Sequence, residues 1–150
     1  MLRVARLLPV AALLLAAAAC DSGRHSSAGF RLPESGDVER GKAVFVAFGC
    51  YHCHEVHGAD LPRPDVQPPV PVVLGGEVTK ELTDGYLVTS VINPSHRLAP
   101  YPKELITTGG HSRMTSYADQ MTVRQLIDLV AYLQSRYTVR RTPPGRYSYY

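Results

Sequence analysis

The fold of this chain is decided by the pentapeptide Cys50-Tyr51-His52-Cys53-His54, which brings two thiols and an imidazole together. Two cysteines three positions apart, followed at once by a histidine, form the pattern by which proteins attach haem covalently. Each thiol can add to one vinyl group on the same porphyrin edge, and the histidine then lies next to the iron. We therefore expect Cys50 and Cys53 to hold one haem c, with His54 as the proximal iron ligand.

Two alternatives share the Cys-x-x-Cys spacing. A thioredoxin-like redox dithiol is accompanied by a βαβ pattern, which does not surround this motif. Half of a zinc site needs a second cysteine or histidine pair at ligand spacing, and His96 and His111 do not form such a pair. The pentapeptide therefore favours haem, and a disulfide or zinc remains as the alternative.

Residues 1–19 have the layout of a secretory signal peptide. Arg3 and Arg6 make the first residues cationic, residues 7–15 form an apolar run, and small residues precede Cys20. The apolar run is short for crossing a bilayer, although an uncleaved anchor helix is the alternative. The sequence therefore predicts export, which fits haem attachment outside the cytoplasm.

The cleavage region Ala17-Ala18-Ala19-Cys20 resembles a bacterial lipobox, although Ala17 stands where Leu is preferred. Ordinary cleavage at an A-x-A site is the alternative, and it would leave a free thiol. The chain has three cysteines and the pentapeptide uses two. A lone exposed thiol is a liability in an oxidising compartment, and lipidation removes it. We therefore predict a lipid on Cys20 that anchors the protein to the cell membrane, facing the periplasm or outer side.

The charge of the chain says little about its partners. The formal net charge is +3, and loss of Arg3 and Arg6 with the signal leaves about +1. No basic stripe with interleaved aromatic residues occurs, so nucleic acid is not an expected partner. Four arginines gather near the C-terminus and are expected to lie on a solvated tail, with anionic lipid or an acidic partner as the alternative; they are Arg136, Arg140, Arg141 and Arg146.

Three regions follow the signal peptide. Residues 20–34 are rich in Ser, Gly, Arg and His without apolar periodicity, which predicts a flexible tether. Residues 35–138 are the expected folded domain. Residues 139–150, which contain Thr142-Pro-Pro-Gly and several tyrosines, are expected to form a flexible tail.

The first helix is expected to begin at the N-cap Asp37 and to run to about Phe48. Val38, Gly41 and Phe45 share one face at helical spacing. A glycine in the middle of such a face lowers helix stability, so it predicts a second helix crossing close by.

Two further helices are expected. One runs from the N-cap Thr83 through Ile92, where Pro94 ends it. The other starts with a capping box, Thr122 and Gln125, and is expected to end near Tyr137. Between them residues 95–119 are expected to be loop, as are residues 61–72, which hold five prolines.

From about Asp37 to Tyr137 the chain resembles a small class I cytochrome c. The matching features are a glycine and an aromatic before the motif, the motif itself, a proline-rich loop, a methionine, and the final helix Gln125-Leu-Ile-Asp-Leu-Val-Ala-Tyr-Leu133. The resemblance implies an all-α cytochrome c fold, with three to four short helices and long loops around one covalently bound haem. It also implies that the first and last helices cross, with Gly41 and Phe45 against Tyr132.

The resemblance further implies a methionine thioether on the distal side of the iron, which raises the reduction potential relative to a second histidine. Met114 lies in a loop before the last helix, where the family has this ligand, although Thr115 follows it where proline is usual. Met121 directly precedes the helix cap and is expected to pack. The alternatives are His96, His111 or an open distal position.

The resemblance also nominates residues around the haem. In the family a proline carbonyl in the loop after the motif accepts a hydrogen bond from the proximal histidine, so Pro69 and Pro71 are candidates. Arg97 and Tyr101 are candidates for the haem propionates, with exposed loop positions as the alternative.

Together these features predict a membrane-tethered cytochrome c with one haem, acting as an electron carrier between other redox proteins in a respiratory or related chain, and not as an enzyme. One alternative is a haem subunit of an oxidoreductase complex for terminal oxidation or sulfur oxidation. Residues 86–95 are similar to cytochrome domains appended to some terminal oxidase subunits. A haem enzyme or gas sensor is the alternative if the distal position is open.

Overall fold

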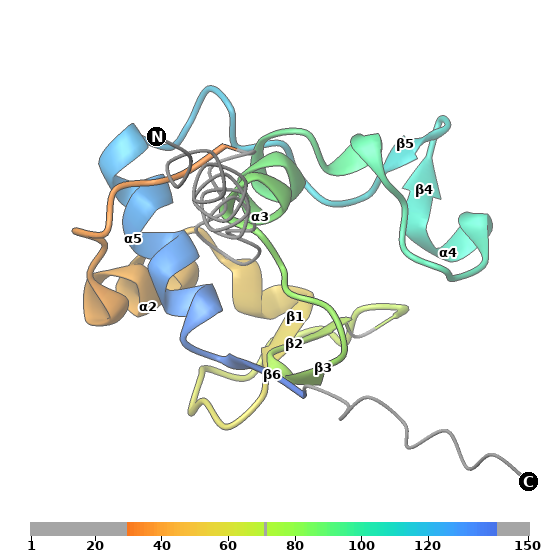
Figure 1. The fold of residues 1–150 in the computed structure, drawn as a ribbon. Coiled ribbons are helices and arrows are strands. Elements are labelled where there is room, and N and C mark those ends of the chain that lie inside the picture. Colours follow the sequence, from red (N-terminus) through yellow and green to blue (C-terminus); the bar gives the residue numbers. More distant parts are fainter. Residues whose placement is uncertain (1–29, 71, 141–150) are drawn as a thin grey trace, which may run out of the picture.

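The computed structural model describes residues 30–70 and 72–140 (Figure 1). The predicted signal peptide, Cys20, most of the tether and the tail from residue 141 lie outside the described residues. In chain order the elements are α2 Val38–Ala47, η1 Cys50–His52, β1 His54–Val56, β2 Val72–Leu74, β3 Gly76–Val78, α3 Asp84–Ile92, η2 Pro94–His96, α4 Lys103–Ile106, β4 Thr107–Thr108, β5 His111–Ser112, α5 Val123–Gln134 and β6 Tyr137–Val139. No helix in this part of the chain combines the length and the apolar character needed to cross a bilayer.

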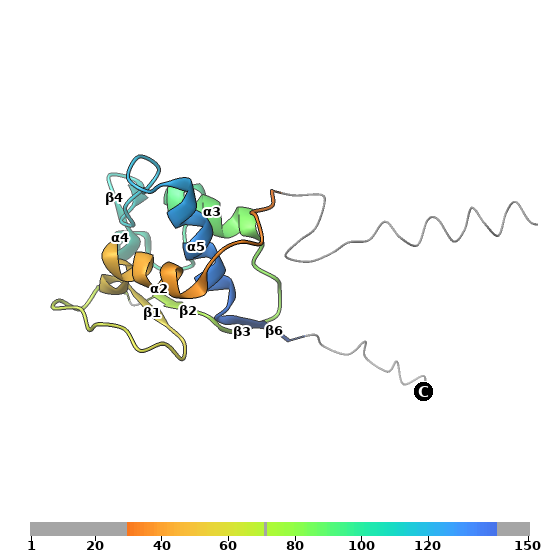
Figure 2. The same cartoon turned by 90° about the vertical axis from the view of Figure 1, so that its left-hand side faces the viewer.

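Helices α2 and α5 begin where the sequence predicts and pack against each other (Figure 2). The Asp37 side chain accepts from the backbone N–H of Arg40, and Thr122 and Gln125 form the reciprocal capping box. These side chains satisfy backbone donors that a helix leaves free in its first turn. Local sequence signals therefore fix both helix starts.

The predicted close approach at Gly41 is confirmed. A Cβ on Gly41 would lie 2.0 Å from the carbonyl oxygen of Asp128 and 2.6 Å from the Cβ of Tyr132. One turn further along, the rings of Phe45 and Tyr132 meet edge to face with centroids 5.8 Å apart. Glycine is required here because only a hydrogen leaves room for the backbone of α5.

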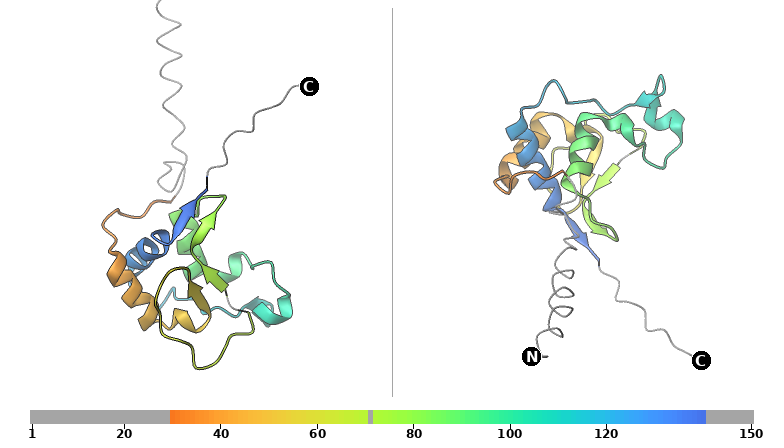
Figure 3. Two further views of the ribbon diagram at one scale, coloured as in Figure 1. Left: turned by 90° about the horizontal axis from the view of Figure 1, so that it is seen from below. Right: turned by 45° about the horizontal axis from the view of Figure 1, so that its top comes forward.

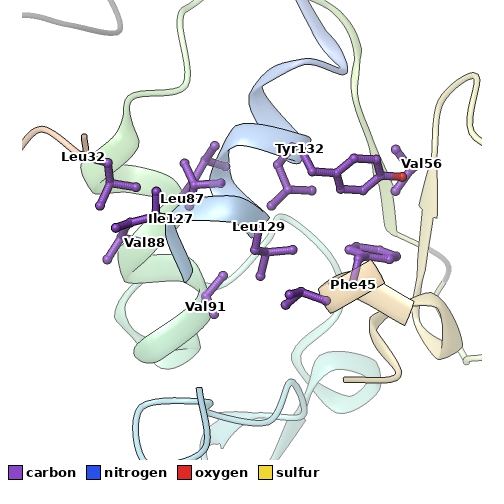
Figure 4. Close-up of a cluster of buried hydrophobic side chains, with 12 residues drawn as sticks. Leu32, Phe45, Val56, Leu87, Val88, Val91, Ile127, Leu129 and Tyr132 are labelled. Carbon is purple, nitrogen blue, oxygen red and sulfur yellow. The ribbon is translucent and has the colours of Figure 1, made fainter. Parts of the chain in front are cut away.

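The hydrophobic core lies between α2, α3 and α5 (Figure 4). Tyr132 is fully buried and Phe45 and Leu129 are nearly so. Leu87, Val88 and Val91 cover the core from α3 and Ile127, Val130 and Leu133 from α5, with Val44 on α2, Val56 on β1 and Leu32 before α2.

The folded domain begins earlier than predicted. Leu32, in the predicted tether, is buried, and its backbone N–H donates to the carboxylate of Asp84 at 3.2 Å. Asp84 is itself buried at the first turn of α3, next to the N-cap Thr83, whose side chain accepts from Tyr86 N–H. The chain from Leu32 is therefore part of the domain, because a buried carboxylate and the core both hold it.

The C-terminal part of the domain also differs from the prediction. Helix α5 ends at Gln134 and not near Tyr137, since strand β6 leaves it to pair in parallel with β3 (Figure 3). The pairing is extended by Arg140, which donates its N–H to Val78 O and forms an ion pair with Glu77. Val139 and Arg140 thus belong to the folded structure and not to a flexible tail.

Residues 95–119 are not the plain loop that the sequence predicts. Within them lies an arm, defined here as residues 97–113, that holds α4 and the β4–β5 hairpin. The arm and the α2–α5 pair lie on opposite sides of α3 (Figures 1 and 3). The hairpin turns through Gly109 and Gly110, whose φ angles of 58° and 82° suit glycine. The strands of this all-α fold are thus short additions, each pair only two or three residues long.

Candidate haem site

The attachment motif follows directly from the end of α2. Phe48 caps the helix, and Gly49 turns the chain with a left-handed φ of 67° into the 3-10 turn η1. Cys50 lies in this turn and Cys53 follows it, with the N–H of Cys53 donating to the Cys50 carbonyl at 3.2 Å. The turn therefore holds the two cysteines on one short, hydrogen-bonded loop.

Among the described residues, neither thiol of the motif forms a disulfide. Cys53 is exposed, whereas Cys50 is half-buried, and burial raises the pKa of its thiol to about 11. Cys50 is therefore a protonated thiol at neutral pH, the form that adds its S–H across a vinyl group. The exposed Cys53 leaves the second attachment point open to an approaching ring.

His54 begins strand β1, which pairs with β2 so that His54 lies opposite Val72. Among the described residues its buried Nδ1 makes no hydrogen bond of good geometry. Burial lowers the pKa of the imidazole, and the backbone of Val72 opposes this shift. The ring is therefore neutral at physiological pH, as an iron ligand must be.

The resemblance nominates the carbonyl of Pro69 or Pro71 as the partner of His54, and this stays a prediction. The backbone that the structure places opposite His54 is that of Val72. Pro69 is exposed, and Pro71 lies outside the described residues. Val72 occupies this place because the β1–β2 pairing brings it opposite His54. The orphaned Nδ1 of His54 beside the Val72 backbone fits a proximal ligand whose second nitrogen faces a carbonyl.

A cavity of about 470 Å³ borders the motif. Its walls come from residues 51–56 on one side and from the proline-rich loop on the other, and they include Cys53 and His54. Open volume therefore adjoins both a thiol and the imidazole that are expected to hold haem.

Met114 follows strand β5 and is half-buried, with its N–H donating to the hydroxyl of Ser112 at 3.2 Å. Three residues on, the Tyr117 hydroxyl donates to the carbonyl of Phe48 at 3.1 Å. Burial raises the pKa of Tyr117, so the hydroxyl keeps its proton. The segment that carries Met114 is thereby attached to the helix end that leads into the motif.

The other candidate ligands occupy different surroundings. Met121 packs against the hydrophobic core, as expected for a packing residue. His96 is exposed and its Nδ1 lies 2.9 Å from the Asn93 carbonyl, while His111 is exposed in the hairpin. Arg97 and Tyr101, the candidates for the propionates, are exposed on the arm, so their role stays a prediction.

The donor set fits haem better than a metal ion alone. In the described part of the chain, no group of three or more histidine, cysteine or acidic side chains could hold a metal ion, so zinc finds no ligand set there. Two thiols, a neutral imidazole and a thioether are the groups that hold haem c. These residues could therefore bind haem covalently and ligate its iron.

Sequence reasoning missed one residue that shapes the site and one that joins α5 to the start of α2. Tyr117 ties the Met114 segment to α2, and its position three residues after the candidate ligand was the available signal. Asp128 is buried inside the apolar stripe of α5 and accepts from the N–H of Asp37 at 2.9 Å and from Arg40 Nε at 2.9 Å. A single acid within an apolar stripe was its signal.

One of three comparisons with known proteins found a match. The family model described as Cytochrome c matches residues 38–136, which span α2 to the end of α5 and all the candidate haem residues. A comparison with curated proteins and one with solved structures found no match.

Proposed function

Because this chain belongs to the cytochrome c family, whose members carry covalently attached haem c, we propose that it is a membrane-tethered electron carrier with a single haem. Cytochrome c domains transfer electrons through haem and exchange them with other redox proteins. We further propose which residues ligate the haem iron, that a lipid tethers the protein to the membrane, and that the protein carries electrons without catalysing a reaction. Each rests on particular residues.

The haem is proposed to be held by four side chains. Cys50 and Cys53 form thioether bonds to the porphyrin, His54 is the proximal iron ligand, and Met114 is the distal ligand. Bound haem c supplies an iron that gains or loses one electron. With the neutral imidazole and the thioether both held as iron ligands, the haem would exchange electrons without binding a substrate or a gas.

The observation that carries the proposal is the attachment of the Met114 segment to the end of α2. Tyr117 reaches Phe48, which stands two residues before Cys50. This contact supports a thioether that lies close to the attachment motif in space although it is far away in sequence. Met121 is engaged with the core instead, so it is not free to serve.

The visible spectrum of the haem-loaded protein tests the ligand assignment. Iron bound to a thioether gives a weak band in the near-infrared region. We expect this band in the ferric protein, its loss in Met114→Ala, and its retention in the matched control Met121→Ala. Persistence of the band in Met114→Ala would assign the distal position to another residue. A wild-type protein without the band that binds carbon monoxide readily would favour a gas sensor or a catalyst.

The membrane tether is proposed from the sequence of the first 20 residues. A lipid on Cys20 would leave residues 21–29 between the membrane and the folded domain, which begins by Leu32. Such a span lets the domain reach partners at the periplasmic or outer face of the cytoplasmic membrane. We expect Cys20→Ser to move the protein from the membrane fraction to the soluble fraction, and the control Ser22→Ala to leave it with the membrane. Intact-mass analysis of the membrane-bound form checks the lipid itself.

A carrier and a permanent subunit differ in how they purify. A carrier leaves solubilised membranes alone, whereas a subunit of an oxidoreductase complex leaves with its partners at fixed stoichiometry. We expect the haem protein to elute alone in mild detergent. Elution at fixed stoichiometry with other redox subunits would replace the carrier proposal with the complex-subunit alternative.

A further inference from the structure

The segment after Met114 is fastened first to the C-terminus of α3. The hydroxyl of Ser116 donates to the carbonyl of Ile92 at 2.6 Å, and the N–H of Tyr117 donates to the carbonyl of Val91 at 3.3 Å. The last carbonyls of a helix have no partner within the helix, and here these two residues provide one. The α3 end therefore serves as a fixed support for the segment.

The same segment is fastened a second time, to the C-terminus of α2. The ring of Tyr117 stands perpendicular to that of Phe48, with centroids 5.5 Å apart, and its hydroxyl donates to the Phe48 carbonyl at 3.1 Å. Phe48 is itself held by its N–H, which donates to Val44 O at 3.0 Å. One side chain thus contributes both an aromatic contact and a hydrogen bond to the residue that precedes the motif turn.

Met114 by contrast is held only lightly by its own backbone. Its N–H reaches the Ser112 hydroxyl, within the hairpin that precedes it. The hairpin belongs to the arm, and its strand β5 contacts η2, the turn that follows α3, where the N–H of Ser112 donates to the hydroxyl of Ser95 at 3.0 Å. A thioether at this position needs a second point of support on the side of the motif, and Tyr117 is the residue that reaches there.

We propose that Tyr117 is the positioning residue for Met114: by bonding to Phe48 it sets the separation between the distal thioether and the attachment motif. The proposal rests on the proposed function, in which Met114 is the distal ligand. Tyr117 does not touch the iron in this scheme and acts through the three-residue link to Met114. Loss of its hydroxyl would leave the fold intact and let the thioether move away from the iron more often.

Competition by imidazole measures this effect directly. Imidazole binds ferric haem only when the thioether leaves, so its apparent affinity reports the fraction of open sites. Removing a hydrogen bond of typical net strength corresponds to about a fivefold change in an equilibrium. We therefore expect Tyr117→Phe to bind imidazole about fivefold more tightly than the wild-type protein, with a weaker near-infrared band and an unchanged haem content.

Two further variants make the test specific. Tyr117→Leu also removes the ring contact with Phe48 and is expected to bind imidazole more tightly still. The imidazole affinity of Tyr117→Phe should therefore lie between those of the wild-type protein and Tyr117→Leu. Tyr86→Phe removes the hydroxyl of a partly exposed tyrosine on α3 and is expected to match the wild-type protein. A purely structural role for Tyr117 would lower the unfolding midpoint of its variants without changing imidazole affinity.

The outcomes separate this inference from the proposed function. If Met114→Ala loses the near-infrared band while Tyr117→Phe and Tyr117→Leu bind imidazole as the wild-type protein does, Met114 is the ligand and the positioning role of Tyr117 is overturned. If Met114→Ala keeps the band, the ligand assignment fails first and the role of Tyr117 fails with it. A graded rise in affinity across the two Tyr117 variants, absent in Tyr86→Phe, supports the inference.

Discussion

Gly41 on α2 lies against the backbone of Asp128 on α5, so closely that a Cβ on Gly41 would be 2.0 Å from the Asp128 carbonyl oxygen. The neighbouring atom is backbone, which cannot rotate away as a flexible side chain could. The contact therefore sets how closely the two helices approach and where Phe45 meets Tyr132.

Gly41→Ala is accordingly expected to destabilise the haem-loaded protein by roughly 3 kcal/mol, because α2 must move away from α5 and the core opens. Alanine is the better helix former by about 1 kcal/mol, which offsets only part of this loss. The measurement is guanidinium unfolding of the ferric protein. The matched control is Gly85→Ala in α3, where the nearest atom to the new Cβ is the Phe30 Cβ at 3.3 Å. Equal stability of the two variants would show that the α2–α5 approach tolerates a methyl group.

Asp128→Asn tests the buried carboxylate that joins the N-terminus of α2 to α5. Asp128 accepts from Asp37 N–H and from Arg40, and the bond from Arg40 depresses the pKa of the Asp128 carboxyl below its usual 3.8. We expect a loss of about 1.5 kcal/mol at pH 7, typical of a hydrogen bond to a charged group.

The pH dependence of this loss has a definite sign. A carboxyl with a depressed pKa in the folded state contributes stability above its unfolded pKa, and the contribution disappears as the pH falls through the folded value. The stability difference between the wild-type protein and Asp128→Asn should therefore be constant near neutrality and shrink below pH 3.8. Thermal unfolding at a series of pH values checks it, with Asp65→Asn, an exposed loop substitution, as the control. If the stability difference between the wild-type protein and Asp128→Asn does not change with pH, the charge of Asp128 does not stabilise the fold.

Features that are set by residues close together in the sequence could be predicted from local patterns, whereas contacts between distant residues could not. The N-caps Asp37 and Thr83 and the capping box at Thr122 were predictable because each works within one helical turn. The Gly41–Tyr132 contact was predictable through the family resemblance, since periodicity alone asks for a neighbouring helix without naming it. The position of Tyr117 near Met114 was visible in the sequence, but its contact with Phe48 was not predictable, because the two residues are 69 positions apart.

The short strands were missed for related reasons. Pairs such as β1–β2 and β3–β6 are parallel and three residues long, so they show no alternation that a sequence pattern could reveal. The β4–β5 hairpin did carry a local signal, the Gly109-Gly110 pair between two short polar strands, which is typical of a two-residue hairpin turn. The end of α5 could not be located because pairing with β3, and not any residue within the helix, decides where the chain becomes extended.

Leu32→Ala tests whether the domain begins before residue 35. Leu32 is 8 % exposed and packs in the core cluster beside Asp84, so we expect a loss of about 2 kcal/mol on removing its buried methyl groups. The matched control is Leu105→Ala on the arm, where the side chain is 40 % exposed and the change should stay within about 0.5 kcal/mol. Chemical unfolding of both variants provides the comparison. Equal and small losses of stability in the two variants would show that Leu32 does not stabilise the domain and belongs to the tether, as its local sequence suggests.

Two truncations test strand β6. A chain ending at Arg140 keeps β6 and the ion pair between Arg140 and Glu77, whereas a chain ending at Arg136 loses both. We expect the shorter chain to be less stable than the longer one by roughly 2 kcal/mol, since each backbone hydrogen bond contributes about 1 kcal/mol and surface ion pairs add little. Strand β3 continues from β2, whose Val72 faces His54, so the shorter chain should also exchange its β2 amides faster in the haem-loaded state. Identical unfolding midpoints and exchange rates for the two chains would show that β6 rests on the domain without stabilising the proximal side.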